Sequence, residues 1–290
     1  MKTSLRKLPK RKRDELRIVT DRIRQVVGVD KIILYGSYAR GDWVEELGSN
    51  GYYRYQSDFD LMVIVDEKKL AKKREKWARM EDSIHRSALV KTPVCIITHN
   101  IQYVNEMLRQ GQYFFSDISK EGILIYDSKK SELAKAKKKK SPEERQKKAA
   151  KDFERWYKSA NVFFKHYQYA LNDGDYLNAA FQLHQATERL YSTILLVFTT
   201  HRPKLHDIEK LGRLAAAHDP KLPTVFPRGT DEEIRLFNLL KSAYIESRYD
   251  IENYSITREE LEWLAKRVSK LQKLTASICK KKIRSFTKVG

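Results

Sequence analysis

The first 126 residues alternate between two spacings of apolar side chains. Short runs rich in Ile, Val and Leu predict buried strands, and longer segments with apolar residues three or four positions apart predict helices. The predicted strands cover residues 32–35, 58–65, 94–97 and 122–126, and the predicted helices cover residues 9–27, 67–89 and 101–110. Strands that alternate with helices in this way predict an α/β (α+β) domain.

From residue 142 onward the strand pattern disappears and the helical spacing continues. Ser141 followed by Pro142 and Glu144 has the sequence of a helix N-cap. The predicted helices include residues 153–167, 179–195, 206–218, 231–249 and 257–280. Because short loops join them, we expect an all-α antiparallel bundle.

A change in composition separates the two halves. Residues 129–149 are rich in lysine and predict a linker between a domain at residues 1–128 and a bundle at residues 150–290. The lysine run has two interpretations, a contact with nucleic acid and a solvated connector, and we favour the connector.

The overall charge points to an acidic partner. The 290 residues include 58 Lys or Arg and 38 Asp or Glu, a net charge of +20, which suits nucleotide, RNA, DNA or an acidic protein without choosing among them. Cys95 and Cys279 are too few and too distant for a disulfide framework, so we expect a reducing, cytoplasmic setting. The longest apolar run, residues 194–198, is too short to span a bilayer, and we expect no membrane partner.

Candidate chemistry gathers where two predicted strands meet polar residues. The first strand ends in Gly36-Ser37, a tight turn into helix-compatible sequence, where bare backbone amides suit a phosphate group. Asp58 and Asp60 begin the next strand, and period-two alternation places them on one face. Because two adjacent carboxylates repel, a divalent cation is the usual reason for such a pair, and nearby phosphates favour Mg²⁺.

The combination of Gly36-Ser37, Arg40-Gly41 and Asp58-x-Asp60 resembles the signature of minimal nucleotidyltransferases related to DNA polymerase beta. The resemblance implies a small mixed sheet, a nucleoside triphosphate (NTP) at the turn and two Mg²⁺ ions at the aspartates. It also implies that Asp58 and Asp60 are the catalytic metal ligands and that Gly36, Ser37 and Arg40 bind the nucleotide. We expect ATP as the NTP.

Two features depart from that family. Members usually carry a third carboxylate on a later strand, and its place in this chain is near Cys95, where no acidic residue stands; Asp117 and Glu121 lie downstream without a spacing that brings them to the metals. Residues 42–56 form a long insertion with Trp43 and three tyrosines. Two interpretations stay open for it, an aromatic flap over the nucleotide and a hairpin around residues 48–51.

The C-terminal half resembles a HEPN domain. The segments 179–190, 202–206 and 243–254 carry the resemblance, which implies a helical bundle, a homodimer and, in many members, metal-independent ribonuclease activity. Those ribonucleases use an arginine followed a few residues later by histidine. Here Arg248 is followed by Tyr254 and no histidine, so we expect phosphate contact at Arg248 and Tyr254 rather than RNA cleavage.

The other polar residues of this half have simpler interpretations. His184 and His206 could line a cleft and contact RNA or a bound nucleotide, or they could be hydrogen-bonded inside the bundle, and we favour the structural role. Glu188 and Arg189 have two interpretations, a pair within a site and a pair on the helix surface, and we favour the surface pair.

Two functions therefore stay open. The leading hypothesis is a Mg²⁺-dependent enzyme that moves a nucleoside monophosphate (NMP), which we expect to be AMP, to an unknown acceptor hydroxyl on a small molecule, RNA or protein. The alternative is a catalytically impaired module that binds nucleotide or RNA and regulates a toxin-antitoxin-like nucleotidyltransferase/HEPN system.

Overall fold

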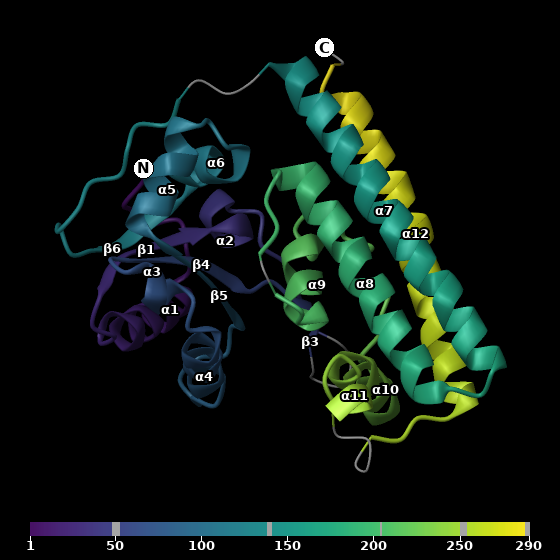
Figure 1. The fold of residues 1–290 in the computed structure, drawn as a ribbon. Coiled ribbons are helices and arrows are strands. Elements are labelled where there is room, and N and C mark those ends of the chain that lie inside the picture. The colour runs from purple at the N-terminus through teal and green to yellow at the C-terminus, as the bar shows by residue number, and fades with distance from the viewer. Residues whose placement is uncertain (48–52, 138–140, 204, 250–253, 288–290) are drawn as a thin grey trace. The chain divides into compact units, whose positions relative to one another are not determined.

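The alternating apolar runs of the N-terminal half pair into a mixed four-stranded sheet (Figure 1). The computed structural model describes residues 1–47, 53–137, 141–203, 205–249 and 254–287. In the sheet, strand order is β5-β4-β1-β6, with β4 and β5 parallel and the other neighbours antiparallel. The strands are β1 (Val29–Tyr35), β4 (Phe59–Val65), β5 (Val94–Asn100) and β6 (Ile123–Asp127). The predicted mixed sheet is confirmed.

Helices cover both faces of this sheet. Figure 1 shows α1 and α4 on one face and α5 and α6 on the other. Alternate residues of β4 therefore enter different cores, with Leu61 and Val63 facing the first pair of helices and Met62 and Ile64 the second. The helices are α1 (Lys10–Arg24), α4 (Arg74–His85), α5 (Ile101–Arg109) and α6 (Tyr113–Glu121). Central strands buried on both faces explain why the sequence runs are apolar throughout.

The predicted helix over residues 67–89 is two helices in the structure, α3 (Lys68–Ala71) and α4. The backbone carbonyl of Leu70 accepts hydrogen bonds from the Lys73 amide at 3.2 Å and from the Trp77 indole at 3.0 Å. In a continuous helix the Leu70 carbonyl would accept the backbone amide four residues later. Here it accepts the buried Trp77 indole instead, because the helix is broken at this point.

The insertion contains a two-stranded antiparallel hairpin, β2 (Glu45–Leu47) and β3 (Tyr53–Gln56), preceded by the short helix α2 (Gly36–Arg40). Trp43 stacks on Tyr38 with ring centroids 5.4 Å apart, so this aromatic residue packs on the core. Residues 48–52 and the side chains of the tyrosines at 52, 53 and 55 lie outside the described part of the chain. The hairpin interpretation is therefore supported, and the flap interpretation stays untested.

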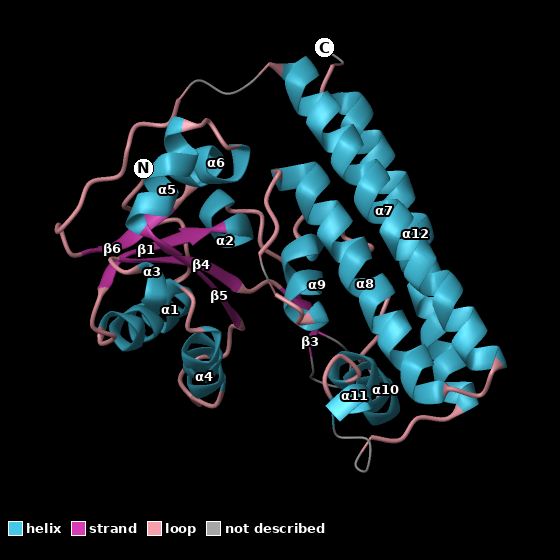
Figure 2. Cartoon of the chain, viewed as in Figure 1, coloured by secondary structure: helices cyan, strands magenta, loops and turns pink. Residues whose placement is uncertain are grey.

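The chain divides into two units, Met1–Lys139 and Lys140–Gly290. The second unit consists of helices (Figure 2). They are α7 (Pro142–Asn172), α8 (Tyr176–Thr199), α9 (Ile208–Ala216), α10 (Asp231–Ser242), α11 (Glu246–Tyr249) and α12 (Arg258–Ser285). Ser141 and Glu144 form the expected capping box at the start of α7. The predicted linker boundaries at 129 and 149 stay a prediction.

The predicted helix over residues 231–249 is also interrupted. The Ala243 amide donates to the Leu239 carbonyl as the last bond of α10, and the Ile245 amide donates to Ser242, three residues back. A three-residue bond winds more tightly than an α-helix and ends the regular ladder. Helix α11 then begins at Glu246 as a separate turn.

Candidate functional site

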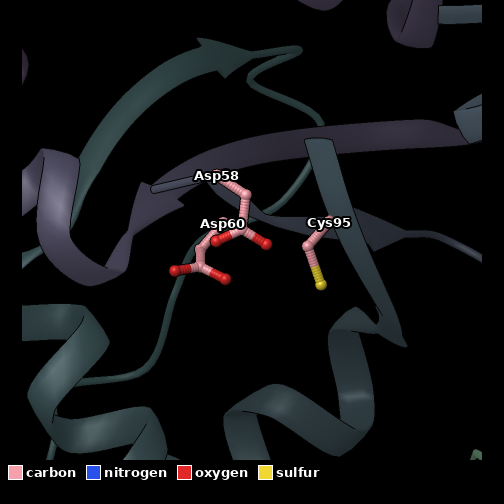
Figure 3. Close-up of side chains that lie close together, drawn as sticks. All are labelled: Asp58, Asp60 and Cys95. Carbon is pink, nitrogen blue, oxygen red and sulfur yellow. The ribbon is translucent and has the colours of Figure 1, made fainter. Parts of the chain in front are cut away.

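The two aspartates predicted from the sequence lie side by side at the start of β4 (Figure 3). In the sheet register, Asp60 stands opposite Tyr35 of β1 on one side and Cys95 of β5 on the other. One potential ligand atom from each of Asp58, Asp60 and Cys95 lies within 4.8 Å of the others. All three residues are buried, with 7%, 5% and 1% of their surfaces exposed.

Gly36 lies directly against this cluster. Its φ is +74°, and a Cβ atom added there would lie 2.0 Å from Oδ2 of Asp60. Two features therefore require glycine at this position: the left-handed backbone conformation and the close approach of the Asp60 carboxylate. The turn and the aspartates, 22 and 24 residues apart in the chain, form one site.

The other two residues predicted to bind nucleotide follow on α2. Ser37 is buried, and its carbonyl accepts the Gly41 amide at 2.8 Å. Arg40 is partly exposed, and its Nε lies 3.0 Å from Oδ2 of Asp42. Ser37 is thus buried at the start of α2, next in the chain to Gly36, whereas the Arg40 guanidinium forms an ion pair near the surface.

Tyr35 is a site residue that the sequence reasoning missed. It is 8% exposed, and its hydroxyl group has no hydrogen-bond partner among the described residues. Burial raises its pKa well above the usual value, and the charges of Asp60, Cys95 and Asp58 raise it further. Its position offered a signal, since it is the last residue of an apolar strand, immediately before Gly36.

Cys95 stands where the resemblance places a third carboxylate. Among the described residues, the group with metal-ligand spacing contains Asp58, Asp60 and Cys95, and neither Asp117 nor Glu121 joins it. Both of those residues belong to α6. The structure therefore brings two carboxylates and one thiol together at this site.

Comparison with known proteins identifies both halves of the chain. A family model described as "Nucleotidyltransferase domain" matches residues 16–151, and one described as "HEPN domain" matches residues 153–278. The chain is a nucleotidyltransferase domain followed by a HEPN domain. No curated protein matches the chain significantly.

Two solved structures are similar to parts of the chain. TT1696 from Thermus thermophilus is 22% identical over 43% of this chain and 97% of its own, with a TM-score of 0.32. A nucleotidyltransferase-like protein from Exiguobacterium sibiricum is 13% identical over 92% of this chain and 77% of its own, with a TM-score of 0.31. These values are too low to bear on the fold or the function.

A buried lysine supports the strand that carries Cys95 in the nucleotidyltransferase domain. Lys12 of α1 is 2% exposed, and its Nζ donates to Oγ1 of Thr92 at 2.5 Å and to a carboxylate oxygen of Glu45 in β2. Glu15 accepts the backbone amide of Thr92 at 2.9 Å. The same polar cluster thus fixes the approach to β5 and the base of the hairpin.

An open depression of about 600 Å³ lies at the other end of β4 and β5. Its lining includes Asp66 and Asn100, which follow or end these strands. The aspartates of the site stand at the beginning of β4, so the depression is separate from the candidate site.

None of the helices in the described part of the chain has the length and the hydrophobicity that a membrane span requires.

The two residues predicted to contact phosphate in the HEPN domain are Tyr254 and Arg248. Tyr254 is 4% exposed and its hydroxyl donates to the Leu239 carbonyl at 2.9 Å, which favours a structural role. Burial raises its pKa. Arg248 belongs to α11, and its side chain lies outside the described part of the structure. Phosphate binding by Arg248 stays a prediction.

Glu188 is not the surface residue that its helical spacing predicts. It is 1% exposed, and its carboxylate lies 3.0 Å from Nδ1 of His206 and 3.5 Å from the Arg202 guanidinium. His206 stacks on Tyr244 with centroids 4.4 Å apart. The carboxylate is buried because partners from the segment after α8 fold over it, which helix periodicity alone does not reveal.

Proposed function

We propose that this chain transfers NMP, which we expect to be AMP, from an NTP to an acceptor hydroxyl. The observation that carries the proposal is the contact between Asp60 and Gly36, which joins a pair of carboxylates to a phosphate-binding type of turn. In the reaction, the acceptor oxygen forms a bond to the α-phosphorus, and the bond to the β-phosphate oxygen breaks. Pyrophosphate leaves with the electron pair, and the hydroxyl proton passes to solvent.

The residues of the site divide this work. Asp58 and Asp60 would hold a divalent cation, for which Mg²⁺ is the expectation from the resemblance; when bound, such an ion neutralises charge on the triphosphate. Gly36 leaves its backbone open to the outer phosphates, and Ser37 can donate a hydroxyl hydrogen bond to them. Arg40 can turn from Asp42 towards the phosphates, because the ion pair is partly exposed and weak.

The donor set fits one cation better than two. Two carboxylates supply the hard oxygen ligands that a single divalent ion accepts, whereas a two-ion arrangement usually shares a third carboxylate. Cys95 stands at that position. The proposal therefore assigns the cation to Asp58 and Asp60 and leaves the deprotonation of the acceptor without a carboxylate base.

Release of pyrophosphate tests the proposal. The full chain with labelled ATP, Mg²⁺ and candidate acceptors should release pyrophosphate and label an acceptor. Asp60→Asn should reduce this release by at least about 100-fold, because it removes a cation ligand's charge. The matched control is Asp82→Asn, an exposed carboxylate on α4, which should react as the wild type does. Equal release by all three proteins would refute the proposal.

A second function is favoured by Cys95 itself. A chain without the third carboxylate can bind NTP or RNA and regulate a toxin-antitoxin-like system without transferring a nucleotide. Calorimetry would then detect NTP binding that Asp60→Asn weakens, while no pyrophosphate forms over the same period. Measurable turnover that depends on Asp60 would exclude this alternative.

A further inference from the structure

Cys95 replaces a carboxylate that the family usually has, and its sulfur atom lies in one cluster with the carboxylates of Asp58 and Asp60. It is paired with Asp60 across the parallel strands, and Figure 3 shows its side chain beside those of Asp58 and Asp60. The three potential ligand atoms lie within 4.8 Å of one another. Adjacent donors on a tetrahedral ion with metal–oxygen and metal–sulfur bonds of about 2.1 and 2.3 Å are about 3.6 Å apart. Small rotations of the three side chains would bring their ligand atoms to the distances that binding one ion requires.

A second observation points to a ligand at this place. Tyr35 is paired with Asp60 across β1 and β4, which puts the two side chains on the same face of the sheet. Tyr35 is buried, and its hydroxyl has no hydrogen-bond partner among the described residues. Leaving such a buried group unsatisfied destabilises the folded state, because the hydroxyl has lost its water and gained no partner. A water or phosphate oxygen carried by a bound cation would give this hydroxyl a partner. The orphan hydroxyl therefore favours an occupied site.

We propose that Asp58, Asp60 and Cys95 bind one thiophilic divalent cation of the Zn²⁺ class in preference to Mg²⁺. When the ion binds, a sulfur–metal bond forms and the thiol proton passes to solvent. Borderline and soft ions gain strongly from a thiolate ligand, whereas Mg²⁺ requires oxygen ligands in octahedral geometry and gives up water reluctantly. Mg²⁺ would have two protein ligands here, and a Zn²⁺-class ion would have three.

The inference deepens the proposed function, on which it rests for the role of the cation, but the two can fail separately. Binding is read from the metal itself and needs no turnover. Co²⁺ is the probe, because a thiolate bonded to Co²⁺ gives an intense charge-transfer absorption that oxygen ligands do not give.

The full chain titrated with Co²⁺ should develop this absorption with one ion bound per chain. One equivalent of Zn²⁺ should remove the absorption, and a 100-fold excess of Mg²⁺ should leave it. Cys95→Ser should abolish the band. The matched control is Cys279→Ser, which changes the other buried cysteine, in α12 of the HEPN domain, and should keep the band.

Absence of the band in the wild type, its persistence in Cys95→Ser, or its removal by an equal concentration of Mg²⁺ would overturn the inference. Cys95→Asp provides a second test, because it installs a third oxygen ligand. It should bind Mg²⁺ at least tenfold more tightly than the wild type by calorimetry, and unchanged Mg²⁺ affinity in a folded variant would count against the inference. A sulfur-dependent band without pyrophosphate release would support the cation site and refute nucleotidyl transfer.

Discussion

Replacing Gly36 by alanine tests whether the turn and the aspartates act as one site. The new Cβ would lie 2.0 Å from Oδ2 of Asp60, whereas ordinary van der Waals contact begins at 3.4 Å. Asp60 must then withdraw by at least about 1.4 Å or the turn must move by as much. A displacement of about 1 Å at a reacting centre can cost about 100-fold in rate. We therefore expect transfer to fall by at least about 100-fold.

Backbone strain must be separated from this clash. A non-glycine residue in the left-handed region costs about 1–2 kcal/mol. Gly174, at the turn before α8, supplies the matched control, because its φ is +76° and nothing lies within 4 Å of an added Cβ. Gly174→Ala should thus lose about 1–2 kcal/mol of stability and keep full activity. Gly36→Ala should lose more stability than that, and its cation affinity as well.

The measurements are pyrophosphate release, Co²⁺ or Mg²⁺ binding by calorimetry, and urea unfolding of both variants. The reasoning is refuted if Gly36→Ala keeps its activity and cation affinity while losing no more stability than Gly174→Ala. That outcome would mean that Asp60 moves freely away from the turn. The two residues would then share a place in the fold without sharing a function.

Two further changes test the polar networks of the domains. Burial alone would raise the pKa of Glu209, but Arg228 and Lys241, each 2.6 Å away, outweigh it and the pKa falls to about 2. Because the pKa of Glu209 is lower in the folded state than in the unfolded state, the wild type should lose about 3 kcal/mol of stability as the pH falls from 5 to 2. Glu209→Gln should lack this loss when unfolding is followed against pH. If the variant and the wild type give the same curve, the stabilising role of the Glu209 carboxylate is refuted. Lys12→Met should lower the free energy of unfolding by about 2 kcal/mol, because Thr92 and Glu45 both lose their hydrogen-bond donor. Urea unfolding measures this loss, and an unchanged stability would contradict the bridging role of Lys12.

The sequence predicted the parts of the fold that depend on local spacing. Apolar runs located the four strands of the sheet, and period-two alternation placed Asp58 and Asp60 on one face. The capping box at Ser141 follows a local rule and was predicted correctly. These features need only neighbouring residues for their explanation, which is why one sequence was enough.

Features that depend on contacts between separate elements were missed or wrong. The break before α4 involves a bond from Trp77 to Leu70, and the burial of Glu188 requires Arg202 and His206 to fold over α8. Tyr35 joins the site because β1 lies antiparallel to β4 in one particular register. Periodicity describes one segment at a time and contains no information about register between segments.

Repulsion between Asp58 and Asp60 is a cost to the fold, and cation binding gives a reason why the fold keeps both carboxylates. Two carboxylates within 4.8 Å repel by at least about 3 kcal/mol at the effective dielectric constant of 20 that suits protein sites. A domain has only about 5–15 kcal/mol of net stability, so this repulsion is a substantial cost. Asp60→Asn should therefore raise the melting temperature in cation-free buffer while it stops transfer. Opposite effects on stability and activity would mark Asp60 as a residue kept for cation binding, because a purely structural carboxylate would lose stability when neutralised.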